Sequence, residues 1–198
     1  MRCDPARLRR ILKNRKRISS RKRGFRRAAV LVPIFERQGD SGLIFTRRTE
    51  TVSTHKGEIS FPGGAVDPED RGPKQAALRE AEEELCLPSR QVEVIGFLDD
   101  IVTLSLFRIT PVVGFVRAPL SLCPNPQEIE KVFEIPVARF LNPAIFRTEE
   151  QFEFQGKPYP VYYFHLPEVT VWGATAKILK QFLTVCCAWD PATGLEAG

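Results

Sequence analysis

The sequence lacks a long hydrophobic run, a disulfide framework and internal repeats. Its longest apolar stretch is the eight residues from Ala28 to Phe35, whereas a membrane-spanning helix needs about 20 residues. Its five cysteines are odd in number, show no CxxC spacing and follow no secretory signal. We therefore expect reduced thiols, a cytoplasmic location and no membrane partner. The composition, 43% hydrophobic and 27% charged over 198 residues, suits one globular domain with a core of its own.

Charge is distributed unevenly along the chain. Residues 1–27 contain 13 Lys and Arg and one acid, whereas residues 28–198 contain 16 basic and 23 acidic residues. The chain is accordingly divided into a basic N-terminal arm over residues 1–26, a main domain over residues 27–185 and a C-terminal tail over residues 186–198.

The arm should contain a short helix. Asp4 and Pro5 suit an N-cap and a first helical position, and apolar residues recur at helical spacing from Leu8 to Leu12. Three interpretations stay open: a solvated helix resting its few apolar residues on the body, a weak contact with RNA or another polyphosphate, and a mitochondrial presequence. On each of them we expect the arm to add nothing to the main core and to be dispensable for chemistry.

The rest of the chain mixes strands with a few helices. A hairpin is expected from residues 28–35 and 43–46 with a turn at Gly39–Gly42. A long helix is expected over residues 73–86 and a closing helix over 174–183. Further strands are expected over residues 58–61, 92–98, 109–116, 161–164 and 169–172. Because regular βαβ alternation is missing, the fold class is a mixed-sheet α/β or α+β sandwich.

The predicted helix over residues 73–86 carries an acidic edge. At 100° per residue Glu80, Glu83 and Glu84 gather on one side, while the small and apolar residues lie on another. Like charges at these spacings repel, and a divalent cation such as Mg²⁺ or Mn²⁺ would offset the repulsion through hard oxygen ligands. Just upstream, Gly63 and Gly64 permit a tight turn that can lay this edge along a cleft.

These residues resemble the Nudix hydrolase signature, GX5EX7REUXEEXGU, in which U is aliphatic. Gly64 matches its first glycine, and the REUXEE core is matched by Arg79, Glu80, Ala81, Glu83 and Glu84. Three positions depart from it: the first acid is Asp70, Arg79 comes one residue late, and Cys86 replaces the glycine that ends the helix.

An upstream segment is similar to the LLTXR(S/A)X3RX3GX3FPGG motif of one Nudix branch, the coenzyme A diphosphatases. At the motif spacing stand Ile44-Phe45-Thr46-Arg47-Arg48-Thr49, Gly57 and Phe61-Pro62-Gly63-Gly64, with Ser53 in place of the second arginine. Lys56 or Arg47 can substitute for that arginine. Two downstream segments, residues 124–137 and 171–176, look like the same branch.

The resemblance implies a Nudix α/β/α sandwich with a mixed sheet and metal-dependent hydrolysis of coenzyme A or acyl-CoA. Implied metal ligands are Glu80, Glu83 and Glu84. The implied general base is Glu128 or one of those three glutamates, and Arg79 would orient carboxylates. Contacts with the substrate are assigned to Arg47, Arg48, Lys56, Gly57, Gly63 and Gly64.

Two other functions remain open, together with a homodimer. One is a Nudix hydrolase of another diphosphate, such as ADP-ribose, a dinucleotide or an RNA cap. The other is a nucleotide- or RNA-binding regulator without turnover. The basic arm favours RNA, whereas the full set of glutamates favours catalysis.

Overall fold

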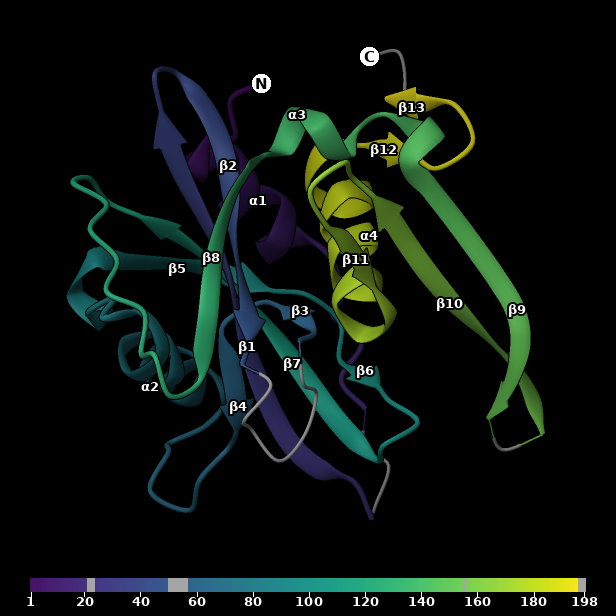
Figure 1. Cartoon of the computed structure of the whole chain (residues 1–198), viewed down its shortest axis with the longest axis horizontal. Coiled ribbons are helices and arrows are strands. Elements are labelled where there is room, and N and C mark those ends of the chain that lie inside the picture. The colour runs from purple at the N-terminus through teal and green to yellow at the C-terminus, as the bar shows by residue number, and fades with distance from the viewer. Residues whose placement is uncertain (21–23, 50–56, 155, 196–198) are drawn as a thin grey trace.

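A computed structural model describes residues 1–20, 24–49, 57–154 and 156–195, and its centre is an eight-stranded sheet (Figure 1). The strand order is β3-β2-β1-β7-β5, with β4 paired to β1, β6 to β7 and β8 to β2. Because β1 and β7 run parallel and the other pairs antiparallel, the sheet is mixed, as predicted. Its strands are β1 (Arg26–Arg37), β2 (Asp40–Arg48), β3 (Ile59–Ser60), β4 (Gly63–Ala65), β5 (Val92–Phe97), β6 (Ile101–Val102), β7 (Phe107–Val116) and β8 (Ile129–Pro136).

Helices and a smaller sheet surround this centre. The helices are α1 (Pro5–Asn14), α2 (Pro73–Leu85), α3 (Val137–Phe140) and α4 (Gly173–Cys187), with 3₁₀ turns η1 (Ser89–Gln91) and η2 (Pro143–Ile145). The small sheet joins β9 (Phe146–Phe154), β10 (Lys157–His165) and β11 (Thr170–Trp172), and a further pair joins β12 (Trp189–Asp190) and β13 (Gly194–Leu195). Among the described residues, no helix has the length and apolar character needed to cross a membrane.

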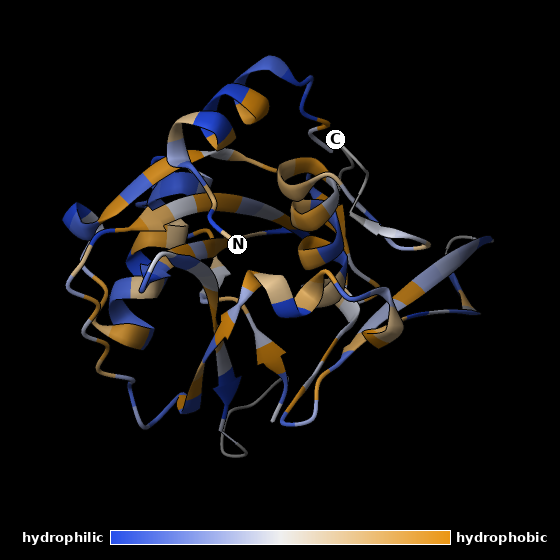
Figure 2. Ribbon diagram, turned by 90° about the horizontal axis from the view of Figure 1, so that it is seen from above, coloured by the Kyte–Doolittle hydropathy of each residue, from blue (hydrophilic) through white to orange (hydrophobic). Residues whose placement is uncertain are grey.

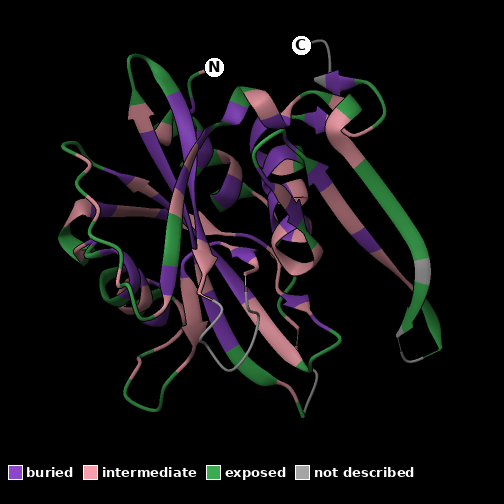
Figure 3. Ribbon diagram, viewed as in Figure 1, coloured by how far each residue is buried: buried purple, intermediate pink, exposed green. Residues whose placement is uncertain are grey.

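Side chains that alternate along β1 place one hydrophobic cluster on each face of the central sheet. On β1, Ala29 and Leu31 belong to the hydrophobic cluster that includes α2, whereas Val32 and Ile34 belong to the cluster that includes α4. Successive side chains of a strand point to opposite faces, so the central sheet is covered on both. Figure 2 shows hydrophobic residues on the central strands and hydrophilic ones in peripheral loops, and Figure 3 shows burial concentrated in the sheet and α4. The predicted α/β/α sandwich is confirmed.

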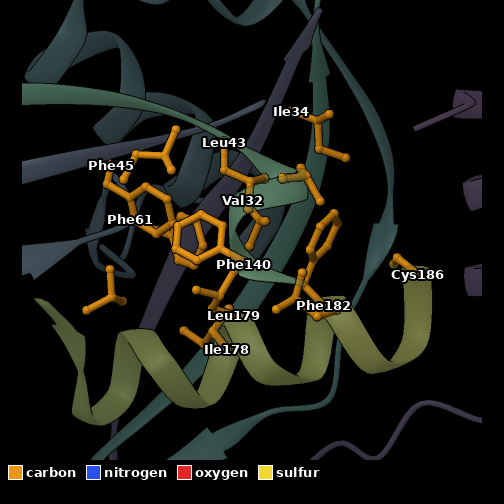
Figure 4. Close-up of a cluster of buried hydrophobic side chains, with 14 of the residues drawn as sticks. Val32, Ile34, Leu43, Phe45, Phe61, Phe140, Ile178, Leu179, Phe182 and Cys186 are labelled. Atoms are coloured by element: carbon orange, nitrogen blue, oxygen red, sulfur yellow. The ribbon is translucent and has the colours of Figure 1, made fainter. Parts of the chain in front are cut away.

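The larger core lies between the sheet and α4. Phe45 and Phe61 stack with centroids 4.6 Å apart, and Phe140 packs 5.6 Å from Phe45. Leu179 and Phe182 of α4 close this cluster from the other side (Figure 4). Phe61 lies two residues before β4, where Gly63 and Gly64 form a strand paired with β1 instead of the predicted tight turn, and the complete burial of Phe61 helps to fix where β4 begins.

The predicted hairpin is present, but its turn is shifted. Arg37 pairs with Asp40, which leaves Gln38 and Gly39 as a two-residue turn with φ values of 52° and 84°. Two successive positive φ angles match the twist of a tight hairpin. The strands therefore extend further than their apolar residues alone indicate.

The basic arm contributes to the core, contrary to expectation. Asp4 caps α1 as predicted, and Leu8 and Leu12 are buried at 1% and 7% exposure. Helix α1 packs on β5 and α4, and Leu12 lies against Gly96, where a Cβ would come within 2.8 Å of it. Further along, Arg17 pairs with the buried Asp100 at 2.5 Å.

The C-terminal segment is also more integrated than a tail. Helix α4 continues to Cys187, and both Cys186 and Cys187 are buried. Trp189 is 1% exposed and donates from Nε1 to the Leu141 carbonyl at 3.0 Å. The division of the chain at residues 26 and 185 remains a prediction, but side chains beyond both boundaries help to form the core.

Candidate active site

The acidic residues are placed by helix α2. Pro73 occupies its first turn, and its buried side includes Ala77 and Leu85, which pack against the sheet. The helix ends at Cys86, which adopts the left-handed conformation at φ 55° and ψ 31°. Cys86 thus has the conformation in which a glycine commonly ends a helix, so the departure from the signature leaves the helix end in place.

Gly64 lies directly against Glu80. A Cβ built on Gly64 would meet the carboxyl carbon and one carboxyl oxygen of Glu80 at 2.5 Å. Only a residue without a side chain leaves room for this carboxylate beside the β4 backbone. Burial is the main cause that raises the pKa of Glu80, Arg79 opposes it, and the charges of Glu83 and Glu128 add to it.

Gly63 and Arg48 both contact Glu84. The Gly63 N–H donates to Glu84 Oε2 at 3.3 Å, and Arg48 Nη1 lies 3.3 Å from Oε1. Glu84 is 1% exposed. Its burial raises its pKa to about 8; Arg48 and the Gly63 N–H oppose this, while the charges of Glu80 and Glu128 add to it.

Arg79 holds the outer carboxylates. It donates from Nη1 to Glu83 at 2.9 Å and from Nη2 to Asp70 at 3.1 Å and to the Ala65 carbonyl at 3.1 Å. Burial raises the pKa of Asp70, but the hydrogen bonds from Arg79 and the Asp67 N–H, together with the charge of Arg79, outweigh it, and the net shift is downward. Asp70, where the signature has Glu, is therefore an anchor for Arg79, and Glu83 is the most exposed of the three helix carboxylates.

Glu128 approaches the helix from the loop before β8. Arg48 Nη2 is 3.9 Å from its carboxylate, and Asn125 donates from Nδ2 to it at 3.4 Å. The same loop is tied to the helix end by the Asn125 N–H, which donates to the Glu84 carbonyl at 2.9 Å. The site thus brings Glu80, Glu84 and Glu128 into electrostatic contact around Arg48, while Glu83 is held by Arg79.

The donor set fits a hard divalent cation. Glu80 and Glu84 are carboxylates whose raised pKa values reflect burial and mutual repulsion, and a cation would relieve the repulsion. Within the described part of the chain, no three His, Cys, Asp or Glu side chains are arranged as a ligand group. Their oxygens instead contact Arg48 and Arg79, so binding a cation requires side-chain rearrangement.

A cleft lies between β2, β3 and the segment Leu166–Thr170, and none of Glu80, Glu83, Glu84 and Glu128 lines it. It has a volume of about 790 Å³, and its walls include Arg47, Gly57 and Ile59 on one side and Thr170 on the other. Arg47 stacks on Phe133 with its guanidinium carbon 5.1 Å from the ring centroid. Arg47 and Arg48 are adjacent on β2, so one borders the cleft while the other contacts Glu84.

Most of the expected site residues are therefore near one another. Two of them, Arg47 and Gly57, border the cleft. The others lie around α2: Arg48, Gly63, Gly64, Arg79, Glu80, Glu83, Glu84 and Glu128. Lys56 and Ser53 lie outside the described residues. Sequence reasoning did not single out Asn125, although it belongs to a segment that resembles the family, nor the loop Leu166–Thr170, which carries no motif.

Comparisons with known proteins agree on one family. The model of the NUDIX domain matches residues 25–155. A protein of Photorhabdus laumondii called "Uncharacterized Nudix hydrolase NudL" is 37% identical over 156 residues, covering 79% of this chain and 82% of its own. "Nudix hydrolase 22, chloroplastic" and "Nudix hydrolase 15, mitochondrial" of Arabidopsis thaliana are each 38% identical over 174 residues, covering 84% of this chain.

This chain spans 57% and 61% of the length of those two plant relatives. The solved structure of a MutT/nudix family protein from Enterococcus faecalis is similar at a TM-score of 0.52 and 13% identity, over 84% of this chain and 64% of that chain. At this identity the likeness concerns the fold alone.

Proposed function

The chain belongs to the Nudix hydrolase family, and from this membership we propose that it hydrolyses the diphosphate of coenzyme A or acyl-CoA. The products are adenosine 3′,5′-bisphosphate and 4′-phosphopantetheine or its acyl form. Family membership itself carries the broader activity, hydrolysis of nucleoside diphosphate derivatives.

One observation supports the finer proposal above all. Arg48 comes from the segment that resembles the coenzyme A branch, and it contacts Glu84 of the general Nudix signature at 3.3 Å. Its Nε is buried and has no hydrogen-bond acceptor among the described residues. The two motifs therefore form one site, which retains a guanidinium N–H free to rearrange towards a phosphate.

The residues divide the work of hydrolysis. Glu80, Glu83 and Glu84 would hold Mg²⁺ or Mn²⁺, which when bound neutralises phosphate charge and lowers the pKa of water. Glu128, whose side chain is 42% exposed, is placed to take the proton of the attacking water. The water oxygen bonds to one phosphorus, the bridging P–O bond breaks, and the leaving phosphate departs with its oxygen.

The arginines have separate tasks. Arg79 fixes Glu83 and Asp70, so it positions carboxylates rather than touching substrate. Arg48 compensates the buried Glu84, and Arg47 offers a positive charge to the cleft. Gly63 donates its N–H to Glu84, and Gly64 leaves room for the Glu80 carboxylate beside the backbone. Lys56 and Gly57 are proposed to border the same substrate.

A substrate panel with Mg²⁺ or Mn²⁺ tests this function. We expect coenzyme A to be cleaved faster than dephospho-coenzyme A, because Arg47 on the cleft wall can bind the additional 3′-phosphate through charge-assisted hydrogen bonds. ADP-ribose, NADH and capped RNA are the comparison substrates. If one of these exceeds coenzyme A tenfold in kcat/KM, the branch assignment is wrong and only the family assignment stands. Absence of turnover on the whole panel would favour the regulator.

The structure weakens the case for an RNA substrate. Three arginines of the basic arm are paired with acids of the main domain: Arg9 with Glu93, Arg15 with Asp99 and Arg17 with Asp100. Less of the arm's charge is therefore available to a polyanion. Weak nucleic-acid binding by the arm, a homodimer and a cytoplasmic or mitochondrial location remain predictions. Binding to labelled RNA, solution mass and localisation of the tagged chain test them.

A further inference from the structure

Three aromatic side chains form a row on one face of the small sheet. Tyr163 of β10 and Trp172 of β11 are cross-strand partners, and their rings are 10° from parallel with centroids 6.3 Å apart. The ring of His165 continues the row 5.7 Å from Tyr163, also at 10°. We call Tyr163, His165 and Trp172 the aromatic row.

The row faces outward, away from the core. On the opposite face of the same strands, Phe164 and Val171 are completely buried against α4. Trp172 is 43% exposed, whereas Trp189, the other tryptophan, is 1% exposed. Core packing therefore accounts for Trp189 but not for Trp172, which presents much of a large apolar ring to solvent.

The row reaches the wall of the cleft through Thr170. His165 Nδ1 lies 3.2 Å from Thr170 Oγ1, so Thr170 shares the face of the row, and Thr170 is also part of the cleft wall. Arg47 and Ile59 stand on the other side of that cleft. Thr175, three residues after Trp172, donates from Oγ1 to the Ile59 carbonyl at 3.0 Å, which fixes the start of α4 to β3.

We propose that Trp172 is the stacking site for the purine ring of the nucleotide substrate, whose phosphates extend through the cleft towards Arg47. This rests on the proposed function, because the substrate must be a nucleoside diphosphate derivative. A tryptophan face binds a base without reading its hydrogen-bonding edge, and its rigid ring loses little entropy in doing so. The segment Val171–Ala176, which resembles the coenzyme A branch, thereby acquires a role in binding.

Local charge favours a single nucleotide over a nucleic-acid strand. The Tyr163 hydroxyl donates to Glu149 at 3.1 Å, which places a carboxylate beside the middle ring of the row. Glu168 stands on the cleft wall and is paired with Arg139. A nucleic-acid backbone that continues past the row would be repelled by Glu149, whereas the phosphates of a single nucleotide in the cleft would meet Arg47 and a Glu168 already paired with Arg139.

Tryptophan fluorescence tests the stacking directly. Adenosine 3′,5′-bisphosphate should quench the wild type and leave Trp172→Phe unchanged, because that variant retains only the buried Trp189. 4′-Phosphopantetheine, which has no base, should quench neither protein. Equal quenching of Trp172→Phe, or none in the wild type at millimolar bisphosphate, would overturn the proposal. This measurement needs no turnover, and AMP as a second probe, which carries the purine without the 3′-phosphate, should quench in the same way whether or not coenzyme A is the substrate.

Kinetics supply the second test, with the adenine nucleotide that the substrate panel ranks first. Trp172→Ala should raise KM about tenfold and leave kcat within about twofold, and Trp172→Phe should keep most of the affinity. Phe152→Ala is the matched control, since Phe152 is an aromatic residue of the same sheet at 42% exposure and pairs with Tyr159, outside the row. An unchanged KM in Trp172→Ala, or an equal rise in Phe152→Ala, would refute the assignment.

Discussion

The two adjacent glycines of β4 should respond oppositely to the same substitution. At Gly64 the added methyl would lie 2.5 Å from the Glu80 carboxyl group, and ordinary contact begins at 3.4 Å. The end of a flexible side chain must therefore retreat by about 1 Å, which costs little stability. A displacement of this size at a catalytic group costs roughly a hundredfold in rate, or about 2.7 kcal/mol of barrier. We expect Gly64→Ala to fold normally and to lose about two orders of magnitude in kcat.

At Gly63 the methyl would meet main-chain atoms instead. It would fall 2.4 Å from the Ala29 carbonyl oxygen and 2.6 Å from the Val30 Cα, in a strand that cannot retreat. Overpacking of this kind costs about 1–3 kcal/mol or more. At the middle of that range, about 2 kcal/mol, Gly63→Ala should lower Tm by about 4–8 °C, since 1 kcal/mol corresponds to roughly 2–4 °C in a chain of this size.

The assay pairs thermal unfolding with steady-state turnover and titration of Mn²⁺ binding. Gly64→Ala should keep Tm within about 3 °C of the wild type and lose turnover together with Mn²⁺ affinity. Wild-type turnover in Gly64→Ala would refute the reasoning, because Glu80 would then not need its observed position. Unfolding of Gly64→Ala would also refute it, because the clash would then not be relieved by the side chain.

Three further outcomes follow from individual residues. Glu83→Gln and Glu84→Gln should each lower kcat about a thousandfold, equal to about 4 kcal/mol, with an unchanged circular dichroism spectrum; near-normal turnover of both at saturating Mg²⁺ would remove the metal-site proposal. Cys86→Gly should raise the free energy of unfolding by about 0.5–1 kcal/mol, because Cys86 has φ 55°, and Cys86→Ala, which keeps that strain, should not. Burial raises the pKa of Asp100, but hydrogen bonds from Thr110 and Arg17 help to bring that pKa below 3.8. The ionised Asp100 carboxylate therefore stabilises the fold above pH 3.8, and this stabilisation is lost as the pH falls through the pKa of Asp100 in the folded protein. Denaturant unfolding should give a wild-type advantage over Asp100→Asn of about 3 kcal/mol at pH 7 that shrinks below about pH 4, and a constant difference would contradict this.

Elements with local signals were predictable from the sequence. Helix α2 was expected over residues 73–86 and spans Pro73–Leu85, because a proline at its start and small apolar residues at helical spacing specify it locally. The pairing of Arg79 with Glu83 likewise depends on spacing within one helix. Arg48 and Glu84 stand in two different motifs and are 36 positions apart, so only the shared resemblance could suggest their contact.

Features that depend on distant contacts were not predictable. Leu12 is buried because Gly96, far along the chain, leaves a space for it, and nothing near Leu12 indicates this. Strand β9 was missed because its sequence is rich in charged residues and its edge lies partly in solvent, so it lacks an apolar pattern. The cleft is closed by Leu166–Thr170, whose role depends on how the small sheet packs on α4.

The position of helix α1 bears on the order in which the chain acquires its structure. Leu8 and Leu12 pack on β5 and α4, and α4 ends at Cys187, so α1 obtains its final neighbours only after the chain has been made as far as Cys187. The contact between α1 and α4 joins segments that are far apart in the sequence, and such contacts raise the contact order and slow folding. During translation the basic segment should therefore remain extended and available to cellular factors, and it should become inaccessible to them once α4 has docked.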